Sequence, residues 1–356
     1  MNARATAVID LGAFRANVAH LAALVAPART MLAVKANAYG HGMQQLAHAA
    51  LASGADSLAV LDVPAGLALR EAGITAPLFA WLHGVDTDFA AAAAADLDLG
   101  ISASWQIQAI RAAAPGSRVR VHLKIDTGLS RNGASVEDWP ELVLVALDAA
   151  AAGDVTIAGA WSHLADASPD EDERSLARLH EAVAVAASLG CDFPLLHLAA
   201  SSAGIRLPAA RLDLVRFGIA AYGVSPFDDE SGRDLGLTPV MTLRSRIIAV
   251  ADGEATVSIG YGDGVAAPGV AAPGIPGAEV LVGGERRRIL SIGVDTLVID
   301  AQGAPVSVGD DVVVFGTGDD GGPTAEEWAA WADTNGDEIV VRVADRVARE
   351  YVDSAQ

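Results

Sequence analysis

The first 226 residues alternate short apolar runs with longer stretches whose apolar residues recur at helical spacing. Segments such as FRANVAHLAALVA, MQQLAHAALA, WQIQAIRAAA and LARLHEAVAVAAS have the periodicity of amphipathic helices. Repeated strand–helix units predict a parallel sheet, and eight of them in about 220 residues predict a (β/α)8 barrel of the TIM type. The predicted strands are Thr30–Val34, Asp56–Leu61, Pro77–Trp81, Leu97–Ile101, Val119–Ile125, Val155–His163, Phe193–Ala199 and Leu212–Tyr222.

The pattern changes after Pro226, where the acidic segment FDDESGRDLGLTP leads into sequence rich in Val, Ile and Gly. Runs such as VMTLRSRIIAV, EATVSI, RRRILSI, TLVIDA and VSVGDDVVVF predict short strands separated by turns. We expect one helix at Thr324–Ala332, a last strand from Glu338 to Val352, and a Pro/Gly loop within the domain at GVAAPGVAAPGIPG. The chain therefore divides into a barrel, residues 1–228, and a mainly β domain, residues 229–356, with residues 1–9 as candidates for pairing with the β domain.

Composition places the chain among globular proteins with a large core, since 52% of its 356 residues are hydrophobic and 19% are charged. No apolar stretch is long enough for a membrane span, and the N-terminal sequence lacks the pattern of a secretory signal. Cys191 is the single cysteine, which excludes an intrachain disulfide and a Cys-rich metal site. These features predict a cytoplasmic protein.

The formal net charge of −21 argues against a nucleic-acid partner, because binding phosphates requires clustered Lys and Arg. Most of the acidity is expected on a solvated surface. The few basic residues that follow apolar runs therefore stand out, and several of them come where predicted strands end.

Catalytic groups of barrel enzymes lie at the carboxyl ends of the strands and in the loops that follow. Polar side chains capable of acid–base or binding chemistry come at five of these ends. They are Lys35; Lys124, Asp126 and Arg131 in KIDTGLSRNG; Ser162 and His163; His197 with Ser201 and Ser202; and Arg216 with Gly218 and Ile219.

Lys35 follows the apolar run MLAV, so its side chain is expected to start inside the barrel. A buried lysine is costly unless it is paired or used, and a desolvated amine is a good nucleophile for a Schiff base. The structural alternative is a lysine whose amine reaches solvent beyond the strand end. Tyr39, beside two glycines, is a candidate phosphate ligand or else a packing residue.

The loops after the last two barrel strands predict a phosphate site, built from Ser201-Ser202 and the amides of Gly218 and Ile219. A Ser-Ser pair can equally be a helix cap. No nucleotide-binding glycine motif follows a strand. His163 and His197 have no further ligands at metal-binding spacing, so no metal is expected.

These segments together resemble the alanine racemase family, whose members bind pyridoxal 5'-phosphate and combine a barrel with a β domain. AVKANAYGHG is similar to the family's cofactor-lysine motif, and KIDTGLSRNG to its second signature. HLAASSAG and VRFGIAAYG resemble its phosphate and pyridine segments, and SIGYGDG resembles the segment of its other catalytic tyrosine. The motifs run in family order from residue 33 to about residue 300.

The resemblance implies that Lys35 carries pyridoxal phosphate and that Tyr261 is the opposing base of a two-base racemisation. Two bases on opposite faces allow a proton to leave one side of the α-carbon and return on the other. His163 is implied as the neighbour that relays the proton of Tyr261. Arg216 is implied to face the pyridine nitrogen, where a guanidinium keeps that nitrogen unprotonated and limits side reactions such as transamination.

The resemblance also implies that Arg131 binds the cofactor's phenolic oxygen and the substrate carboxylate. Lys124 occupies the position of a lysine that is often carbamylated in the family. Tyr261 is implied to reach the partner subunit's active site, which predicts a homodimer with shared sites. The implied phosphate contacts are Tyr39, Ser201, Gly218 and Ile219.

Three departures from the family pattern bear on the substrate. Val294 replaces a methionine whose backbone helps to bind the substrate carboxylate, and Ala200 replaces an asparagine before the phosphate serine. Asp345 stands where many members have a tyrosine or a small residue, so a phosphate-binding tyrosine is missing there. Alanine is the expected substrate, with D-alanine for the cell wall as the expected product.

Three other functions are considered. One is a racemase of serine or of larger amino acids on the same scaffold, motivated by Val294. Another is a related decarboxylase, which Arg216 and the lack of cysteine after Cys191 argue against. The last is a cofactor carrier without activity, but such carriers lack a second domain.

Overall fold

The computed structural model describes residues 5–166, 168–267, 277–303 and 305–354. The chain forms two compact units. The barrel unit consists of Val18–Lys35 and Ala50–Gly218, and the β unit consists of Met1–Asn17, Ala36–Ala49 and Ile219–Gln356. Most of the predicted Pro/Gly loop, residues 268–276, lies outside the described residues.

The barrel unit contains an eight-stranded parallel sheet in the order β8-β7-β6-β5-β4-β3-β2-β9. Backbone hydrogen bonds from Asp213 to Leu196 (3.2 Å) and from Arg216 to Ala199 (3.0 Å) join β9 to the β8 segment. Each predicted run overlaps one of these strands, and the predicted (β/α)8 barrel is confirmed. The strands are β2 (Arg29–Ala33), β3 (Ser57–Val60), β4 (Leu78–Ala80), β5 (Asp98–Ile101), β6 (Val119–Lys124), β7 (Val155–Trp161), β8 (Leu196–His197) and β9 (Leu214–Phe217).

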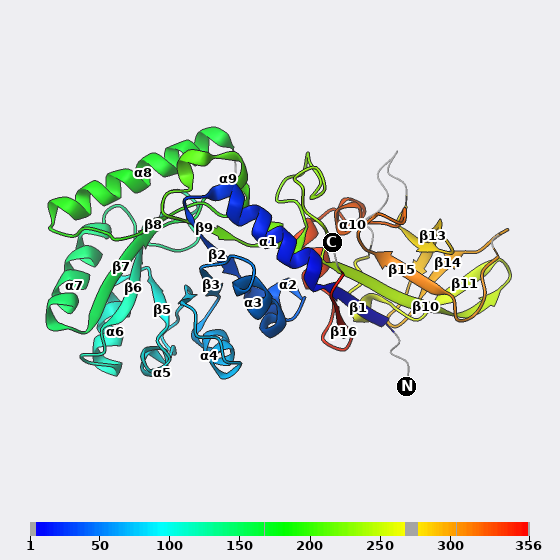
Figure 1. Cartoon of the computed structure of the whole chain (residues 1–356), viewed down its shortest axis with the longest axis horizontal. Helices are drawn as coiled ribbons and strands as arrows, with labels where there is room; N and C mark the ends of the chain where they lie inside the picture. The colour runs from blue at the N-terminus through cyan, green and yellow to red at the C-terminus, as the bar shows by residue number, and fades with distance from the viewer. Residues whose placement is uncertain (1–4, 167, 268–276, 304, 355–356) are drawn as a thin grey trace. The chain divides into compact units, whose positions relative to one another are not determined.

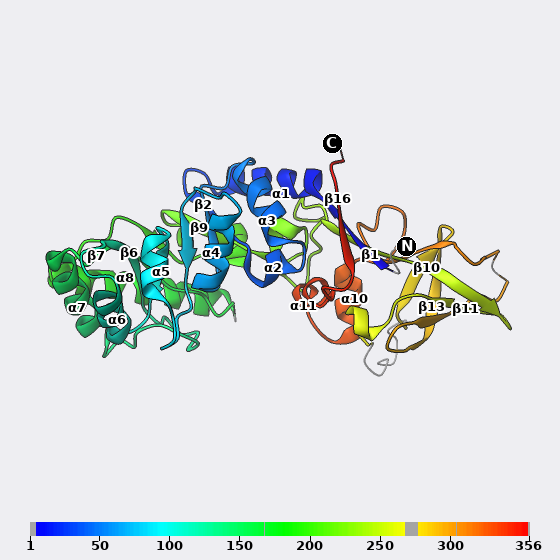
Figure 2. The same ribbon diagram turned by 90° about the horizontal axis from the view of Figure 1, so that it is seen from below.

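Helices surround these strands, as Figures 1 and 2 show for α4 to α8. Their starts follow from capping residues: Asp62 Oδ1 accepts from the amide of Ala65 at 3.0 Å, and Ser168 precedes Pro169 at the start of α8. The helices are α4 (Val63–Glu71), α5 (Phe89–Ala94), α6 (Ser104–Ala113), α7 (Trp139–Ala152), α8 (Pro169–Ser188), α9 (Ser201–Arg206) and the 3-10 turn η1 (Pro208–Ala210). Helices α1 (Leu11–Val25) and α3 (Met43–Leu51) each contain residues of both units.

The barrel core is aromatic and aliphatic. All residues of β3, β4 and β9 are buried, which is the pattern of parallel strands covered on both faces. One buried cluster unites side chains from six strands or strand ends, namely Met31, Ala59, Phe79, Trp161, Leu195 and Leu214.

The β unit contains an eight-stranded sheet in the order β11-β14-β13-β12-β15-β10-β1-β16. The first strand of the chain, β1, pairs antiparallel with β10 and parallel with β16. The strands are β1 (Ala5–Asp10), β10 (Met241–Ala251), β11 (Glu254–Val257), β12 (Glu279–Val282), β13 (Glu285–Ile292), β14 (Leu297–Asp300), β15 (Asp311–Phe315) and β16 (Ala348–Val352). The short helical segments are α2 (Lys35–Tyr39), which begins with the last residue of a barrel segment, η2 (Ile219–Tyr222), η3 (Tyr261–Asp263), α10 (Ala325–Ala332) and α11 (Gly336–Val341).

One predicted element of the β unit is wrong. The sequence from Glu338 to Val352 was expected to form a strand, but its first part belongs to α11 and only Ala348–Val352 forms β16. The helix begins because Asn335 Oδ1 accepts from the amide of Glu338 at 3.0 Å, a local cap that outweighs the β propensity of Ile339-Val340-Val341. Helix α10 begins after Thr324, which forms a capping box with Glu327.

Candidate active site

Lys35 lies at the carboxyl end of β2. The amide of Val34 donates to the carbonyl of Ala59 at 2.9 Å, which extends the parallel ladder to the residue before the lysine. The chain then enters a left-handed turn in which Ala36, Asn37, Ala38 and Tyr39 all have φ between 50° and 55°. Such a backbone costs about 1–2 kcal/mol per residue.

Hydrogen bonds hold this left-handed turn. The amides of Gly40 and Gly42 donate to the carbonyls of Ala36 and Asn37, each at 2.9 Å, and Asn37 Oδ1 accepts from Met43 at 2.8 Å. The turn therefore has one defined course immediately after the lysine, and the backbone position from which the Lys35 side chain leaves the strand is fixed.

Basic side chains gather at the carboxyl ends of the barrel strands. The Lys124 Nζ lies 4.6 Å from the centre of the Trp161 ring, and the Arg216 guanidinium lies 5.2 Å from the same ring. Burial, followed by the charges of Arg216 and Arg131, lowers the pKa of Lys124 to about 8. A substantial fraction of this amine is therefore neutral near physiological pH.

Arg216 is held on several sides. Its Nη1 donates to His197 Nδ1 at 2.9 Å, and its Nη2 donates to the carbonyls of Ser162 and Leu198, each at 2.8 Å. Nη2 also lies 3.1 Å from His163 Nδ1. Burial lowers the pKa of Arg216 to about 9, which still leaves the guanidinium charged at neutral pH.

His163 is a neutral imidazole in this surrounding. Burial, then Arg216, Arg131, Lys124 and Lys35, lower its pKa to about 2. Arg216 has donors only, so His163 Nδ1 accepts and the ring proton belongs on Nε2. His163 can therefore donate a hydrogen bond from Nε2 while remaining uncharged.

Arg131 belongs to a tightly folded loop after β6. Asp126 Oδ1 accepts from the amides of Gly128 and Ser130, each at 3.0 Å, and the amide of Ala134 returns to Lys124 at 2.8 Å. Arg131 itself is exposed, and its charge acts on both Lys124 and His163. The loop thus brings a guanidinium to the rim of the barrel.

Ser201 and Gly218 join the ends of β8 and β9. The Gly218 amide donates to Ser201 Oγ at 3.0 Å, and Ser201 starts helix α9. Ala200, at the cap position of α9, offers no side-chain acceptor to the first amides of that helix. A hydroxyl and backbone amides are therefore concentrated here, as an anion site requires.

In the β unit, Tyr39 is buried and its ring centre lies 4.9 Å from that of Tyr222. Burial, and then the charge of Asp337, raise the pKa of Tyr39 above its ordinary value, so the phenol stays protonated. Ile219 is also buried and starts η2.

The β unit also brings Tyr261 together with the loop that contains Val294. The amide of Tyr261 donates to the carbonyl of Gly293 at 2.9 Å, and that of Gly262 donates to Val294 at 2.8 Å. Arg346 binds Asp263 at 2.8 Å and Asp295 at 2.9 Å, which ties the two segments a second time. Tyr261 is 51% exposed and Val294 is 50% exposed, so both side chains are presented to the solvent.

The sequence interpretation missed His122, which lies on β6 two residues before Lys124 and is buried. Its Nδ1 lies 3.1 Å from His197 Nε2. Alternation along a strand places residues 122 and 124 on the same face, and that signal could have identified His122.

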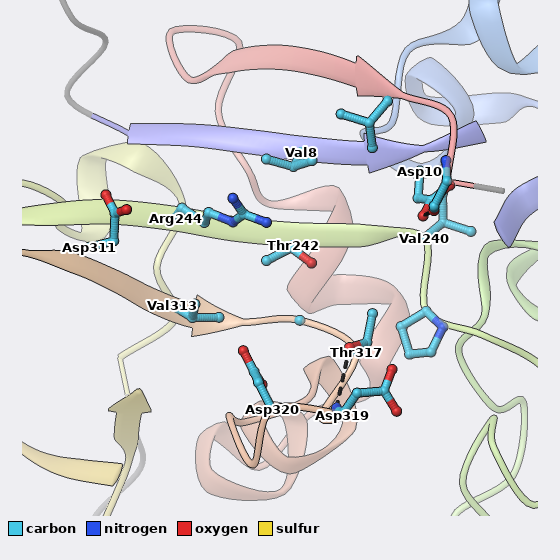
Figure 3. A pocket seen from close by; sticks show the side chains of 14 residues that line it. Val8, Asp10, Val240, Thr242, Arg244, Asp311, Val313, Thr317, Asp319 and Asp320 are labelled. Carbon is cyan, nitrogen blue, oxygen red and sulfur yellow. Dashed lines mark hydrogen bonds between the residues drawn. The ribbon is translucent and has the colours of Figure 1, made fainter. Parts of the chain in front are cut away.

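A cavity of about 450 Å³ lies in the β unit beside β1, β10 and β15 (Figure 3). Arg244 and the carboxylates Asp311, Asp319 and Asp320 are among its lining residues, and none of the predicted site residues is. Within the described part of the chain, no three His, Cys, Asp or Glu side chains are grouped as metal ligands. The helices described there include none with the length and apolar character needed to cross a membrane.

Two family models cover most of the chain: the alanine racemase N-terminal domain matches residues 9–226, and the alanine racemase C-terminal domain matches residues 244–351. The chain belongs to the alanine racemase family. The family resemblance of the motifs is thereby confirmed, and pyridoxal phosphate is the cofactor of this family.

Similar racemases extend over the full chain. An alanine racemase of Frankia casuarinae is 41% identical, with 98% of this chain and 96% of the relative covered. One of Beutenbergia cavernae is 40% identical, with 98% of each covered. The crystal structure of the alanine racemase from D-cycloserine-producing Streptomyces lavendulae superimposes with a TM-score of 0.93 at 36% identity, and covers 100% of this chain and 98% of that one.

Proposed function

We propose that this protein is a pyridoxal-phosphate-dependent racemase that interconverts L-alanine and D-alanine with Lys35 and Tyr261 as its two bases. The observation that carries the proposal is the convergence of Lys124, His163 and Arg216 at the strand ends of a racemase-family barrel, in the same sheet as the strand β2 that precedes Lys35. This set of donors suits an anionic cofactor and an amino-acid carboxylate.

The residues present fit pyridoxal phosphate. Ser201 and Gly218 supply a hydroxyl and an amide for the phosphate, and we assign Tyr39 and the amide of Ile219 to the same group. Arg216 would face the pyridine nitrogen. When bound, the cofactor withdraws electrons from the substrate α-carbon and so makes its proton removable.

Lys35 would hold the cofactor covalently and would exchange a proton with one face of the α-carbon. Tyr261 of the partner subunit exchanges a proton with the opposite face. His163 donates from Nε2 because Arg216 occupies Nδ1, and so it stabilises the phenolate oxygen of the partner subunit's Tyr261. Each direction of racemisation uses one of these bases to remove the proton and the other to return it.

Arg131 binds the substrate carboxylate and the cofactor's phenolic oxygen, and Lys124 orients it. We propose that Lys124 is carbamylated. Its lowered pKa of about 8 supplies the neutral amine, whose nitrogen adds to carbon dioxide and releases one proton to the solvent. The resulting carboxylate would replace an unfavourable cation beside Arg131 and Arg216 with a favourable anion.

We propose a homodimer with shared active sites, which the exposure of Tyr261 and Val294 supports. Both are presented to the solvent although the backbone around them is fixed by hydrogen bonds and by Arg346. A rigid, exposed catalytic tyrosine is suited to complete the site of a second subunit. We further propose that the protein works in the cytoplasm and that its D-alanine serves the cell wall.

The function is tested by following racemisation of L-alanine, L-serine and L-lysine by the purified protein with added pyridoxal phosphate. We expect the highest kcat/KM for alanine. A higher kcat/KM for serine, the alternative that the native Val294 motivates, would replace the alanine assignment. Release of carbon dioxide without racemisation would instead indicate a decarboxylase, and cofactor binding without turnover a carrier.

The cofactor lysine is tested by borohydride reduction followed by peptide mapping. The sequence contains two lysines, Lys35 and Lys124, so the assignment has one built-in control. We expect the cofactor on the peptide of Lys35. Its recovery on Lys124 would overturn the assignment.

A further inference from the structure

Arg216 is the first member of a hydrogen-bonded chain through two barrel histidines, the second of which lies beside a carboxylate at the start of β5. Its Nη1 contacts His197 Nδ1 at 2.9 Å, and His197 Nε2 contacts His122 Nδ1 at 3.1 Å. His122 Nε2 lies 3.5 Å from Asp98 Oδ2, a separation typical of an electrostatic contact. Asp98 in turn accepts from Arg120 at 2.6 Å.

The chemistry of Arg216 gives this chain a direction. A guanidinium has donors only, so His197 Nδ1 must accept and the ring proton lies on Nε2. His197 Nε2 then donates to His122 Nδ1, which places the His122 proton on Nε2, toward Asp98. Burial, and then the charge of Arg216, hold the pKa of His197 well below its ordinary value, so that ring is neutral.

Aromatic side chains fix both rings. The Trp161 ring is parallel to His197 within 3°, with 5.6 Å between the ring centres. Phe79 meets His122 and His197 edge-on, at 5.1 Å and 5.5 Å. Both histidines are buried, so neither ring can turn without displacing these neighbours.

The backbone is shaped around His122. The register between β6 and β7 shifts between Val121 and His122, which pairs with Gly159. A Cβ at Gly159 would clash with the carbonyl oxygen of Leu195 and approach His122 Nδ1 to 3.0 Å. An irregularity in register and a glycine thus leave the space that the ring occupies.

We propose that Asp98, His122 and His197 are positioning residues for the Arg216 guanidinium. His122 accepts from His197 Nε2 and so favours, from the side opposite Arg216, the same Nε2–H tautomer that the guanidinium requires. The other tautomer would direct an N–H at the guanidinium and break the contact. The catalytic consequence rests on the proposed function: a displaced Arg216 would no longer keep the cofactor's pyridine nitrogen unprotonated, and transamination as a side reaction would increase.

Two variants of His122 test the chain. His122→Phe keeps a ring but removes the acceptor, whereas His122→Asn keeps an acceptor near the position of Nδ1. We expect His122→Phe to release the tautomer of His197 and His122→Asn to preserve it. Ring-nitrogen NMR shifts of histidine-labelled holoenzyme report the tautomer directly. A wild-type His197 protonated on Nδ1, or a tautomer unchanged in His122→Phe, overturns the proposal.

The second readout is the side reaction. With L-alanine and one water per event, transamination yields pyruvate, pyridoxamine phosphate and a free Lys35 amine. We expect His122→Phe to raise the ratio of pyruvate formed to alanine racemised by at least about tenfold, which corresponds to about 1.4 kcal/mol. His122→Asn should restore a ratio near that of the wild type. An unchanged ratio in His122→Phe contradicts the proposal.

Phe79→Leu is the matched control, because Phe79 packs on both histidines but does not belong to the hydrogen-bonded chain. We expect it to change neither the tautomer nor the pyruvate ratio. An increase in Phe79→Leu equal to that in His122→Phe would assign the effect to packing and overturn the proposal. Failure of the proposed function is distinguishable, since a wild type that does not racemise alanine still reports its histidine tautomers.

Discussion

The two units present their candidate catalytic residues in opposite ways. In the barrel unit, Lys124, His197 and Arg216 are buried, and burial lowers the pKa of all three. The charge of Arg216 lowers the pKa of Lys124 and of His197 further. In the β unit, the backbone of Tyr261 is tied to the loop of Val294, yet both side chains are half exposed.

This difference shows how the work of the site is divided. A buried cluster can set protonation states and orientations because its dielectric is low and its partners cannot move. A half-exposed side chain such as that of Tyr261 has neither advantage until another surface covers it. In the mechanism that we propose, the barrel therefore prepares the chemistry, and the β unit supplies a base that becomes effective when two subunits assemble.

The largest predicted effect tests that division by complementation. Lys35→Ala and Tyr261→Phe should each be inactive alone. Mixed subunits should regain about one quarter of the wild-type activity, because half of the dimers are mixed and each has one intact site. The measurement is alanine racemisation after the two variants are unfolded and refolded together. No recovery would mean that both bases come from one chain.

A smaller effect is predicted for the buried amine of the barrel unit. Burial destabilises the charged form of Lys124, so Lys124→Met should stabilise the protein without cofactor and bicarbonate by up to about 3 kcal/mol at pH 7. The advantage is full below the folded pKa of about 8 and should vanish as the pH approaches the unfolded value of 10.5. Urea unfolding of both proteins at several pH values measures this difference in the free energy of unfolding. An advantage independent of pH would contradict this account.

The next prediction concerns a segment after Lys35 that belongs to the β unit. Gly42 has φ of +105°, and a Cβ there would clash with the Tyr351 hydroxyl. Gly42→Ala should destabilise the protein by about 1–3 kcal/mol. Gly73→Ala is the control: its φ is +85° but no atom lies within 4 Å of the added Cβ. Equal losses in thermal stability would show that strain, and not the contact with Tyr351, determines the cost.

The smallest effect is expected at Val294. Val294 contacts the Tyr261 segment through its backbone carbonyl, and its side chain is half exposed. Val294→Met should therefore change kcat/KM for alanine within about threefold. Parallel measurement with L-serine shows whether the side chain affects selectivity. A loss of more than tenfold with alanine alone would place this side chain against the substrate.

The sequence by itself determined the elements and the chemical groups at their ends. Strand-and-helix periodicity gave the eight barrel strands because burial on two faces requires continuous apolar runs. The same reading placed Lys35, Lys124, His163 and Arg216 at strand ends, and the structure brings these strand ends together in one sheet. The sequence-based prediction of a strand from Glu338 was wrong, because the cap at Asn335 begins a helix there.

Only the tertiary structure decided what these groups do to one another. The pKa of His163 depends on cations from several strands, and the tautomer of His197 depends on Arg216 and His122, residues 19 and 75 positions away. The exposure of Tyr261 likewise depends on how its turn is tied to the Gly293 loop. Protonation and orientation are set by distances in space, and local sequence patterns fix no such distances between remote residues.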